Sequence, residues 1–240
     1  MSFLYYFLPG LLAGLLVDMA VRRLSGPYSP TDSAGSGEAE AQVAGGAATP
    51  PEGEAGTALL AALDGRDWRR VALVLLTALI IGAVGLRYSD PTQGVIVAVY
   101  AAVLLTCTAT DLIAFRIPNA ITYPAIVLAL VAAALIPEAD LKAAAAGGAV
   151  AGGFMLAIAI ISRGGLGLGD VKLATFAGLA LGVPFIYPAL FLMATLGALV
   201  AVALLLLRLR GKGDPIPYAP VLAAATLVVF FWRGSALATL

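Results

Sequence analysis

The sequence of 240 residues contains no histidine and one cysteine, Cys107. Without histidine the chain lacks the commonest general base and metal ligand of proteins. A single cysteine also excludes an internal disulfide and a cysteine-based metal site. Any chemistry must therefore use carboxylates, hydroxyls, lysine or tyrosine, and we expect a site without a metal.

Charged residues are also scarce: they make up 12% of the chain, whereas hydrophobic residues make up 61%. Soluble domains carry roughly 25% charged residues. The 14 basic and 14 acidic residues cancel, so no overall field attracts nucleic acid. This composition predicts an integral membrane protein whose surroundings are the lipid bilayer, with no nucleic-acid partner.

Long apolar runs divide most of the chain. A membrane-spanning helix needs about 20 mainly apolar residues. Eight runs approach this length, at residues 3–21, 71–86, 94–113, 121–136, 143–161, 171–183, 185–207 and 218–232. We therefore predict an all-α, polytopic membrane bundle of about eight transmembrane helices. Only Pro184 separates the sixth run from the seventh, so seven spans is the alternative.

The basic residues favour eight spans over seven. With the N-terminus outside, eight spans place most basic residues in cytoplasmic segments: Arg22, Arg23, Arg66, Arg69, Arg70, Arg116, Arg163, Lys172, Arg208, Arg210 and Lys212. Only Arg87, Lys142 and Arg233 then lie outside. Fusing the sixth and seventh runs would move the cluster at 208–212 outside, against the positive-inside rule. We expect a multi-pass protein of the cell membrane with both termini outside.

The segment between the first two runs differs in composition from the rest. Residues 25–56 are rich in Gly, Pro, Ser, Thr, Ala and Glu and show no apolar periodicity, which is typical of flexible segments. We predict a first transmembrane helix at 1–24, a flexible cytoplasmic loop without zinc-binding cysteines at 25–69, and a seven-helix membrane core at 70–240.

Three acidic residues lie in or at the edges of apolar runs: Asp18, Asp111 and Asp170. An ionisable group there costs at least a few kcal/mol and needs a reason. Asp18 lies four residues before Arg22, which predicts a local ion pair, with a polar contribution near the site as the alternative. Asp111 closes the third run and Asp170 opens the sixth, so the topology places both just under the cytoplasmic face. Such a pair can hydrolyse an amide, with one ionised Asp accepting a proton from water while the protonated one polarises the carbonyl.

Each of these two aspartates also has a structural interpretation. Asp170 follows glycines and could cap a helix, and Asp111 could pair with Arg116. Their matched depth beside a glycine-rich loop favours catalysis. Asp111 sits near the C-terminus of its span and Asp170 at the N-terminus of its own. The helix dipoles then place a shared proton on Asp111 and make Asp170 the base.

Several motifs resemble those of one known family. Residues 167–173, Gly-Leu-Gly-Asp-Val-Lys-Leu, resemble the GxGDxKL signature of type IV prepilin peptidases. Asp111 with Ile117-Pro118-Asn119 resembles their first-aspartate segment. Residues 11–24 and 216–223 are similar to the family's first helix and C-terminal segment, so the resemblance covers most of the chain outside about 26–90.

The resemblance implies a GxGD-type aspartyl protease with Asp111 and Asp170 as the catalytic pair. The family hydrolyses the bond after the leader of prepilins, pseudopilins or preflagellins at the cytoplasmic membrane face. Further matching positions would bind substrate or support the loops: Gly167, Gly169, Lys172, Pro118 and Asn119. Many members bind zinc through cysteines that this chain lacks. No cofactor is implied, and S-adenosylmethionine is implied only if a methyltransferase activity is retained.

Two other functions fit part of the pattern. Presenilin-like intramembrane aspartyl proteases share GxGD, and residues 188–190 spell their Pro-Ala-Leu motif. Our topology, however, places this tripeptide near the outer face, roughly 30 Å from the aspartates. A proton-coupled small transporter would use membrane carboxylates, but the chain shows no inverted repeat and both aspartates lie at a membrane edge.

Overall fold

The computed structural model describes residues 2–24, 68–88, 90–136, 139–162, 166–207 and 217–233. The predicted flexible loop therefore lies outside the described residues, apart from its last two positions. The described part of the chain is all helical. Its eight helices are α1 (Ser2–Leu24), α3 (Trp68–Arg87), α4 (Pro91–Ala114), α5 (Asn119–Leu135), α6 (Leu141–Ile161), α7 (Leu168–Leu181), α8 (Ile186–Leu206) and α9 (Ala219–Arg233).

Short polar and helix-breaking residues set the helix boundaries. The Asp90 side chain accepts the amides of Thr92 and Gln93 at the start of α4, both at 3.2 Å, which is a standard N-cap. Gly182 ends α7 with a φ of +67°, a conformation that suits glycine. Pro184 follows and cannot continue a helix, so α8 starts afresh. The separation of the sixth and seventh predicted spans is confirmed.

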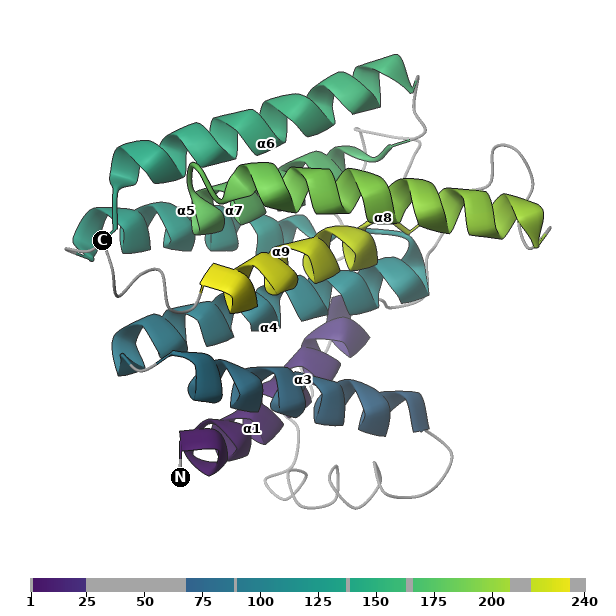
Figure 1. The fold of residues 1–240 in the computed structure, drawn as a ribbon. Coiled ribbons are helices and arrows are strands. Elements are labelled where there is room, and N and C mark those ends of the chain that lie inside the picture. Colours follow the sequence, from purple (N-terminus) through teal and green to yellow (C-terminus); the bar gives the residue numbers. More distant parts are fainter. Residues whose placement is uncertain are drawn as a thin grey trace, which may run out of the picture.

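The helices form a bundle whose layers are visible in Figure 1. At one side α1 packs against α3, where Gly10 and Gly14 bring the α1 backbone close to Ala78 and Val74. At the other side α6 packs against α7. Helix α4 packs against α9 between these two pairs. Fully buried Leu104, Phe176 and Leu222 form part of the core where α4, α7 and α9 meet.

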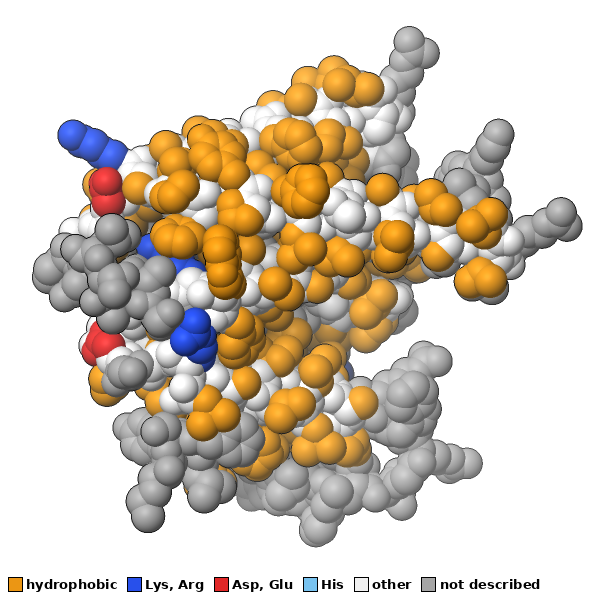
Figure 2. Space-filling model, viewed as in Figure 1, with side chains coloured by type: hydrophobic (Ala, Val, Ile, Leu, Met, Phe, Trp, Pro, Cys, Tyr) orange, Lys and Arg blue, Asp and Glu red, His pale blue; other side chains and the backbone are white. Residues whose placement is uncertain are grey.

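The outside of the bundle is apolar. Large hydrophobic side chains are well exposed along the helices, such as Leu135 (75%), Phe191 (76%) and Leu199 (67%). Figure 2 shows hydrophobic side chains across the middle of the visible face, with the acidic and basic side chains in view towards its left end. Helices α4, α6 and α8 are long and apolar enough to span a membrane, while α5, α9 and residues Val71–Arg87 of α3 are shorter apolar helices. This surface suits lipid, and the chain is a helical membrane protein.

Contacts between helix termini define the two ends of the bundle. At one end, called here the aspartate end, Asp111 near the end of α4 contacts Ala219 at the start of α9. At the opposite end Arg87 donates to the Phe231 carbonyl (2.6 Å), which joins the ends of α3 and α9. There the Val183 amide also donates to the Ala143 carbonyl (3.0 Å), which joins the end of α7 to the start of α6.

The three basic residues predicted to lie outside share the opposite end. Arg87 closes α3, Lys142 opens α6 and Arg233 closes α9. The Pro-Ala-Leu tripeptide in the first turns of α8 follows directly on the end of α7. It therefore lies at the end of the bundle away from the aspartates, as the topology predicts.

Candidate active site

Asp111 projects into the bundle one turn before the end of α4. The residue is buried, with only 6% of its surface exposed. One carboxyl oxygen, Oδ2, accepts the backbone N–H of Ala219 at 3.0 Å, and the amide of Tyr218 interacts with the same carboxyl group. Both amides belong to the start of α9, so the free N–H groups of one helix end meet a carboxylate from another helix.

Asp170 lies in the first turn of α7. The N-cap of this helix is Gly167, so the alternative prediction that Asp170 caps the helix is wrong. The Asp170 Oδ2 atom accepts the Gly167 N–H at 3.2 Å, an arrangement like the returning half of a capping box. The other oxygen, Oδ1, is buried and has no hydrogen-bond partner among the described residues.

The two aspartates come together although 59 positions separate them in the chain. The charge of Asp111 acts directly on Asp170, and the Tyr218 phenol also interacts electrostatically with Asp170. The predicted convergence of the two carboxyl groups at one end of the bundle is therefore found. Two interacting carboxyl groups in a partly desolvated site can share a proton, which is what acid–base hydrolysis requires.

A close approach of the two motif segments holds the aspartates in place. A Cβ atom added at Gly169 would lie 3.0 Å from the Cβ of Ile117, so glycine lets the start of α7 approach the segment after α4. Pro118 is buried and is the N-cap of α5. The glycine and proline of the two motifs thus contribute to backbone packing, and their loop-supporting role stays a prediction.

Lys172 connects the same two segments by a polar contact. Its Nζ donates to Oδ1 of Asn119 at 2.8 Å and lies 4.8 Å from the centre of the Tyr123 ring. The ammonium group therefore joins the first turn of α7 to the first two turns of α5. A positioning role for Lys172 and Asn119 stays a prediction, which this contact motivates.

We predict that Lys172→Ala and Asn119→Ala each lower the cleavage rate by no more than about tenfold, because each removes one exposed polar contact. The double variant should be little worse than either single variant, since both remove the same hydrogen bond. Rates measured on the three purified variants test this. A loss of several orders of magnitude in Lys172→Arg would instead give Lys172 a direct part in the chemistry.

The start of α9 is a site component that the sequence did not reveal. Residues 216–223 were noted only as a resemblance, yet Tyr218 and Ala219 contribute amides to Asp111. A signal was present: Pro217 and Pro220 bracket the start of an apolar run, and proline favours the first turn of a helix. What the sequence could not show was which carboxylate those amides face.

Two further predictions concern ion pairs of Asp18 and Asp111. Asp18 pairs with Arg22, with Oδ2 and Nε 2.8 Å apart, as their spacing predicts. Arg116 is exposed, and no ion pair joins it to Asp111 among the described residues. The hydrogen bond from α9 takes the place of the pairing with Arg116 that was considered for Asp111.

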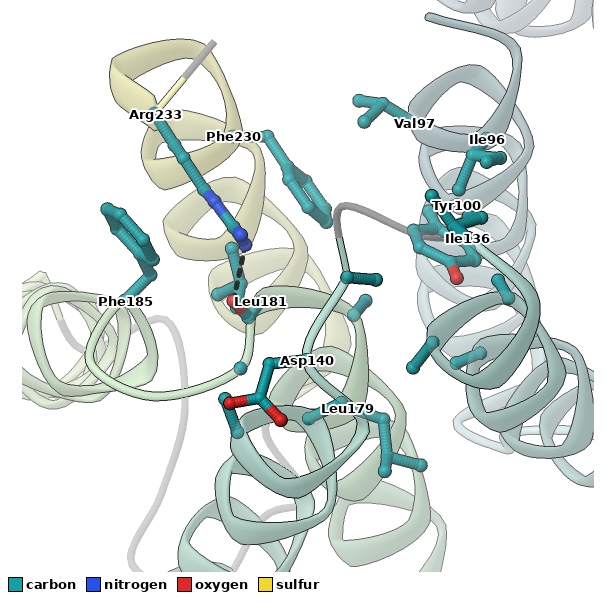
Figure 3. Close-up of a pocket in the computed structure, with 18 of the residues that line it drawn as sticks. Ile96, Val97, Tyr100, Ile136, Asp140, Leu179, Leu181, Phe185, Phe230 and Arg233 are labelled. Carbon is teal, nitrogen blue, oxygen red and sulfur yellow. Dashed lines mark hydrogen bonds between the residues drawn. The ribbon is translucent and has the colours of Figure 1, made fainter. Parts of the chain in front are cut away.

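A cavity of about 240 Å³ lies at the opposite end of the bundle, among α4, α5, α6, α7 and α9. Figure 3 shows its mainly apolar lining, with Arg233 reaching from α9 to the Leu181 carbonyl. The Arg233 guanidinium also lies over the Phe185 ring, 4.3 Å from its centre. Asp140, whose side chain caps α6 through the Lys142 amide, is the carboxylate in the described lining of the cavity, which therefore contains no carboxylate pair. In the described ranges, no group of three or more His, Cys, Asp or Glu side chains could hold a metal ion.

Comparisons with known proteins agree with the motifs. Residues 98–202, which include both aspartates, match the model of the type IV leader peptidase family. The chain is 34% identical over 165 residues to a prepilin leader peptidase/N-methyltransferase of Bacillus subtilis, covering 68% of this chain and 66% of the relative. Proteins of the same name from Xanthomonas campestris (30% over 165 residues) and Aeromonas salmonicida (31% over 171 residues) align over 66% and 67% of this chain.

The aligned part covers 66% of the Bacillus relative and 57% of the other two, so this chain spans less than two thirds of the length of these relatives. No solved structure matches the chain. The family match and the three relatives coincide with the segment that carries Asp111, Asp170 and their supporting residues. The chain belongs to the type IV leader peptidase family.

Proposed function

We propose that this protein is a leader peptidase that hydrolyses the peptide bond after the basic leader of prepilin-like substrates. The observation that carries the proposal is the convergence of Asp111 and Asp170, from separate helices, within the family-matched residues. Prepilins, pseudopilins and preflagellins are the substrate class, since the relatives are named for prepilin leaders. Asp111 and Asp170 are the proposed catalytic residues.

The proposed reaction needs one ionised and one protonated carboxyl group. The ionised Asp takes a proton from a water molecule, and the water oxygen bonds to the scissile carbonyl carbon. The carbonyl oxygen takes the proton of the second Asp, which gives a gem-diol. As the C–N bond breaks, the first Asp gives its proton to the leaving amine, and a gem-diol hydroxyl returns a proton to the second. The net change is addition of one water, and no step uses a metal or S-adenosylmethionine.

We place the aspartate end at the cytoplasmic face of the cell membrane. The support is the distribution of basic residues, because Arg87, Lys142 and Arg233 lie at the opposite end while the other eleven fall in segments assigned to the inside. A basic leader would then remain in the cytoplasm while the substrate's apolar segment stays in the membrane.

Co-expression with a prepilin tests the function. We expect mass spectrometry of the substrate to find a new N-terminus directly after the basic leader, in cells that lack any other leader peptidase. The same spectrum reports whether that N-terminus is methylated, the second activity in the relatives' names.

The matched control is the same leader sequence as a short soluble peptide without the hydrophobic segment. We expect little turnover of this peptide, since the active site lies at the end of a membrane bundle and the substrate must be presented there. An unprocessed prepilin in the presence of folded enzyme would contradict the proposed function. Efficient cleavage of the soluble peptide would contradict presentation from the membrane.

A further inference from the structure

The two aspartates differ in the hydrogen bonds that they receive. Asp111 Oδ2 accepts the Ala219 N–H at 3.0 Å, and the Tyr218 amide interacts with the same carboxyl group. Ala219 is fully buried, so little water competes for this contact. Asp170 Oδ2 accepts one amide, from Gly167 at 3.2 Å. These donors favour a negative charge more strongly on Asp111 than on Asp170.

The second oxygen of Asp170 points to the same difference. No group in the described part of the chain donates to Oδ1, which is buried, and an ionised oxygen is costly where no protein donor replaces its hydration. A proton on this oxygen removes the charge. Asp111 has no buried oxygen without a partner. The proton shared by the pair is therefore more stable on Asp170.

We propose that the first amides of α9 hold Asp111 as the ionised general base, while Asp170 carries the shared proton on Oδ1 and acts as the general acid. This assignment rests on the proposed function and makes Tyr218 and Ala219 positioning residues of the reaction through their backbone amides. Asp111 then activates the water, and Asp170 protonates the carbonyl oxygen.

The helix dipoles alone gave the reverse assignment. Asp111 lies near the C-terminus of α4, its own helix, whose dipole disfavours a negative charge there. In the fold the N-terminus of α9 lies directly against the Asp111 carboxyl group, and a hydrogen bond to a charged group is stronger than the field of a more distant helix end. The contact between α4 and α9 therefore decides which of the two aspartates is ionised.

Among the residues that the structure describes, the other ionisable groups near Asp111 do not supply a compensating cation. Cys107, one turn earlier on α4, interacts electrostatically with Asp111, and Asp170 approaches from α7. The Tyr218 hydroxyl is 3.4 Å from the Met193 carbonyl, to which it donates. Lys172, the nearest basic residue on α7, is directed to Asn119. The α9 amides thus remain the donors that stabilise ionised Asp111.

Infrared titration of the two single variants tests the assignment without any need for activity. With ¹³C-labelled aspartate, the remaining Asp111 in Asp170→Asn should ionise at lower pH than the remaining Asp170 in Asp111→Asn. We expect the two midpoints to differ by about one pH unit or more, as hydrogen bonds to charged groups are worth this much. Equal midpoints, or the reverse order, would overturn the proposal.

Ala219→Pro tests the positioning role directly. Proline is tolerated at the first position of a helix but has no N–H, so this change removes one donor to Asp111. The acid limb of the pH dependence of kcat/KM should move to higher pH by about one unit. At pH values below this limb, kcat/KM should therefore fall by up to about tenfold. Ala219→Gly keeps the N–H and should leave the limb in place.

Because proline could also displace the carboxyl group, the infrared midpoint of Asp111 is measured in Ala219→Pro with Asp170→Asn as well. An upward shift there supports the role of the amide, and an unmoved midpoint with uniformly lower activity would refute it. Failure of the wild-type enzyme to cleave any prepilin would refute the proposed function only, since the infrared titrations still report which aspartate ionises first.

Discussion

Asp111→Asn and Asp170→Asn should each lower the rate of prepilin cleavage by about 10³-fold or more, the range that general acid–base groups contribute. Asparagine keeps the size of the side chain but cannot exchange a proton in either direction. A single remaining carboxyl group cannot both accept the water proton and donate to the carbonyl oxygen. The rate is measured on purified enzyme in detergent or lipid, with a full-length prepilin as substrate.

Asp140→Asn is the matched control for these two variants. Asp140 caps α6 at the opposite end of the bundle, and asparagine is an equally good N-cap. Its activity should stay near that of the wild type. Thermal unfolding of all three variants verifies that they are folded, and wild-type processing by Asp111→Asn or Asp170→Asn would remove that residue from the catalytic pair.

The second large effect is expected in the contact between α6 and α7, at Gly178→Ala. A Cβ atom at this position would collide with the backbone of Gly147, and would lie 2.8 Å from the Cβ of Ala151. Neither neighbour can move without separating the two helices. We expect the free energy of unfolding to fall by about 3 kcal/mol, with a lower midpoint of thermal unfolding and lost activity, because α7 carries Asp170.

Gly153→Ala provides the same chemical change where space is open. A Cβ atom at Gly153, on the exposed side of α6, would have no neighbour within 4 Å. Alanine also favours helix over glycine by up to about 1 kcal/mol, so this variant should be unchanged or slightly stabilised. Equal stability of Gly178→Ala and Gly153→Ala would show that close α6–α7 packing is not required.

The sequence determined much of the fold because the bilayer imposes simple rules. Backbone groups in lipid must be hydrogen-bonded within helices, so long apolar runs predict helices without knowledge of their partners. Pro184 and the basic cluster at 208–212 were sufficient to separate α7 from α8. Similarly, Asp18 and Arg22 lie one helical turn apart, so their ion pair depends only on local geometry.

The sequence by itself also determined which carboxylates belong to the candidate site, since span direction alone places Asp111 and Asp170 at the same end. Only the tertiary structure decided what surrounds each of them. The α9 amides reach Asp111 from 108 positions away, and Lys172 meets Asn119 across 53 positions. Such contacts depend on which helices are neighbours and how they are rotated. A helix-terminus field acts only over about one turn, so the charge of each aspartate depends on the helix packed against it as well as on its own.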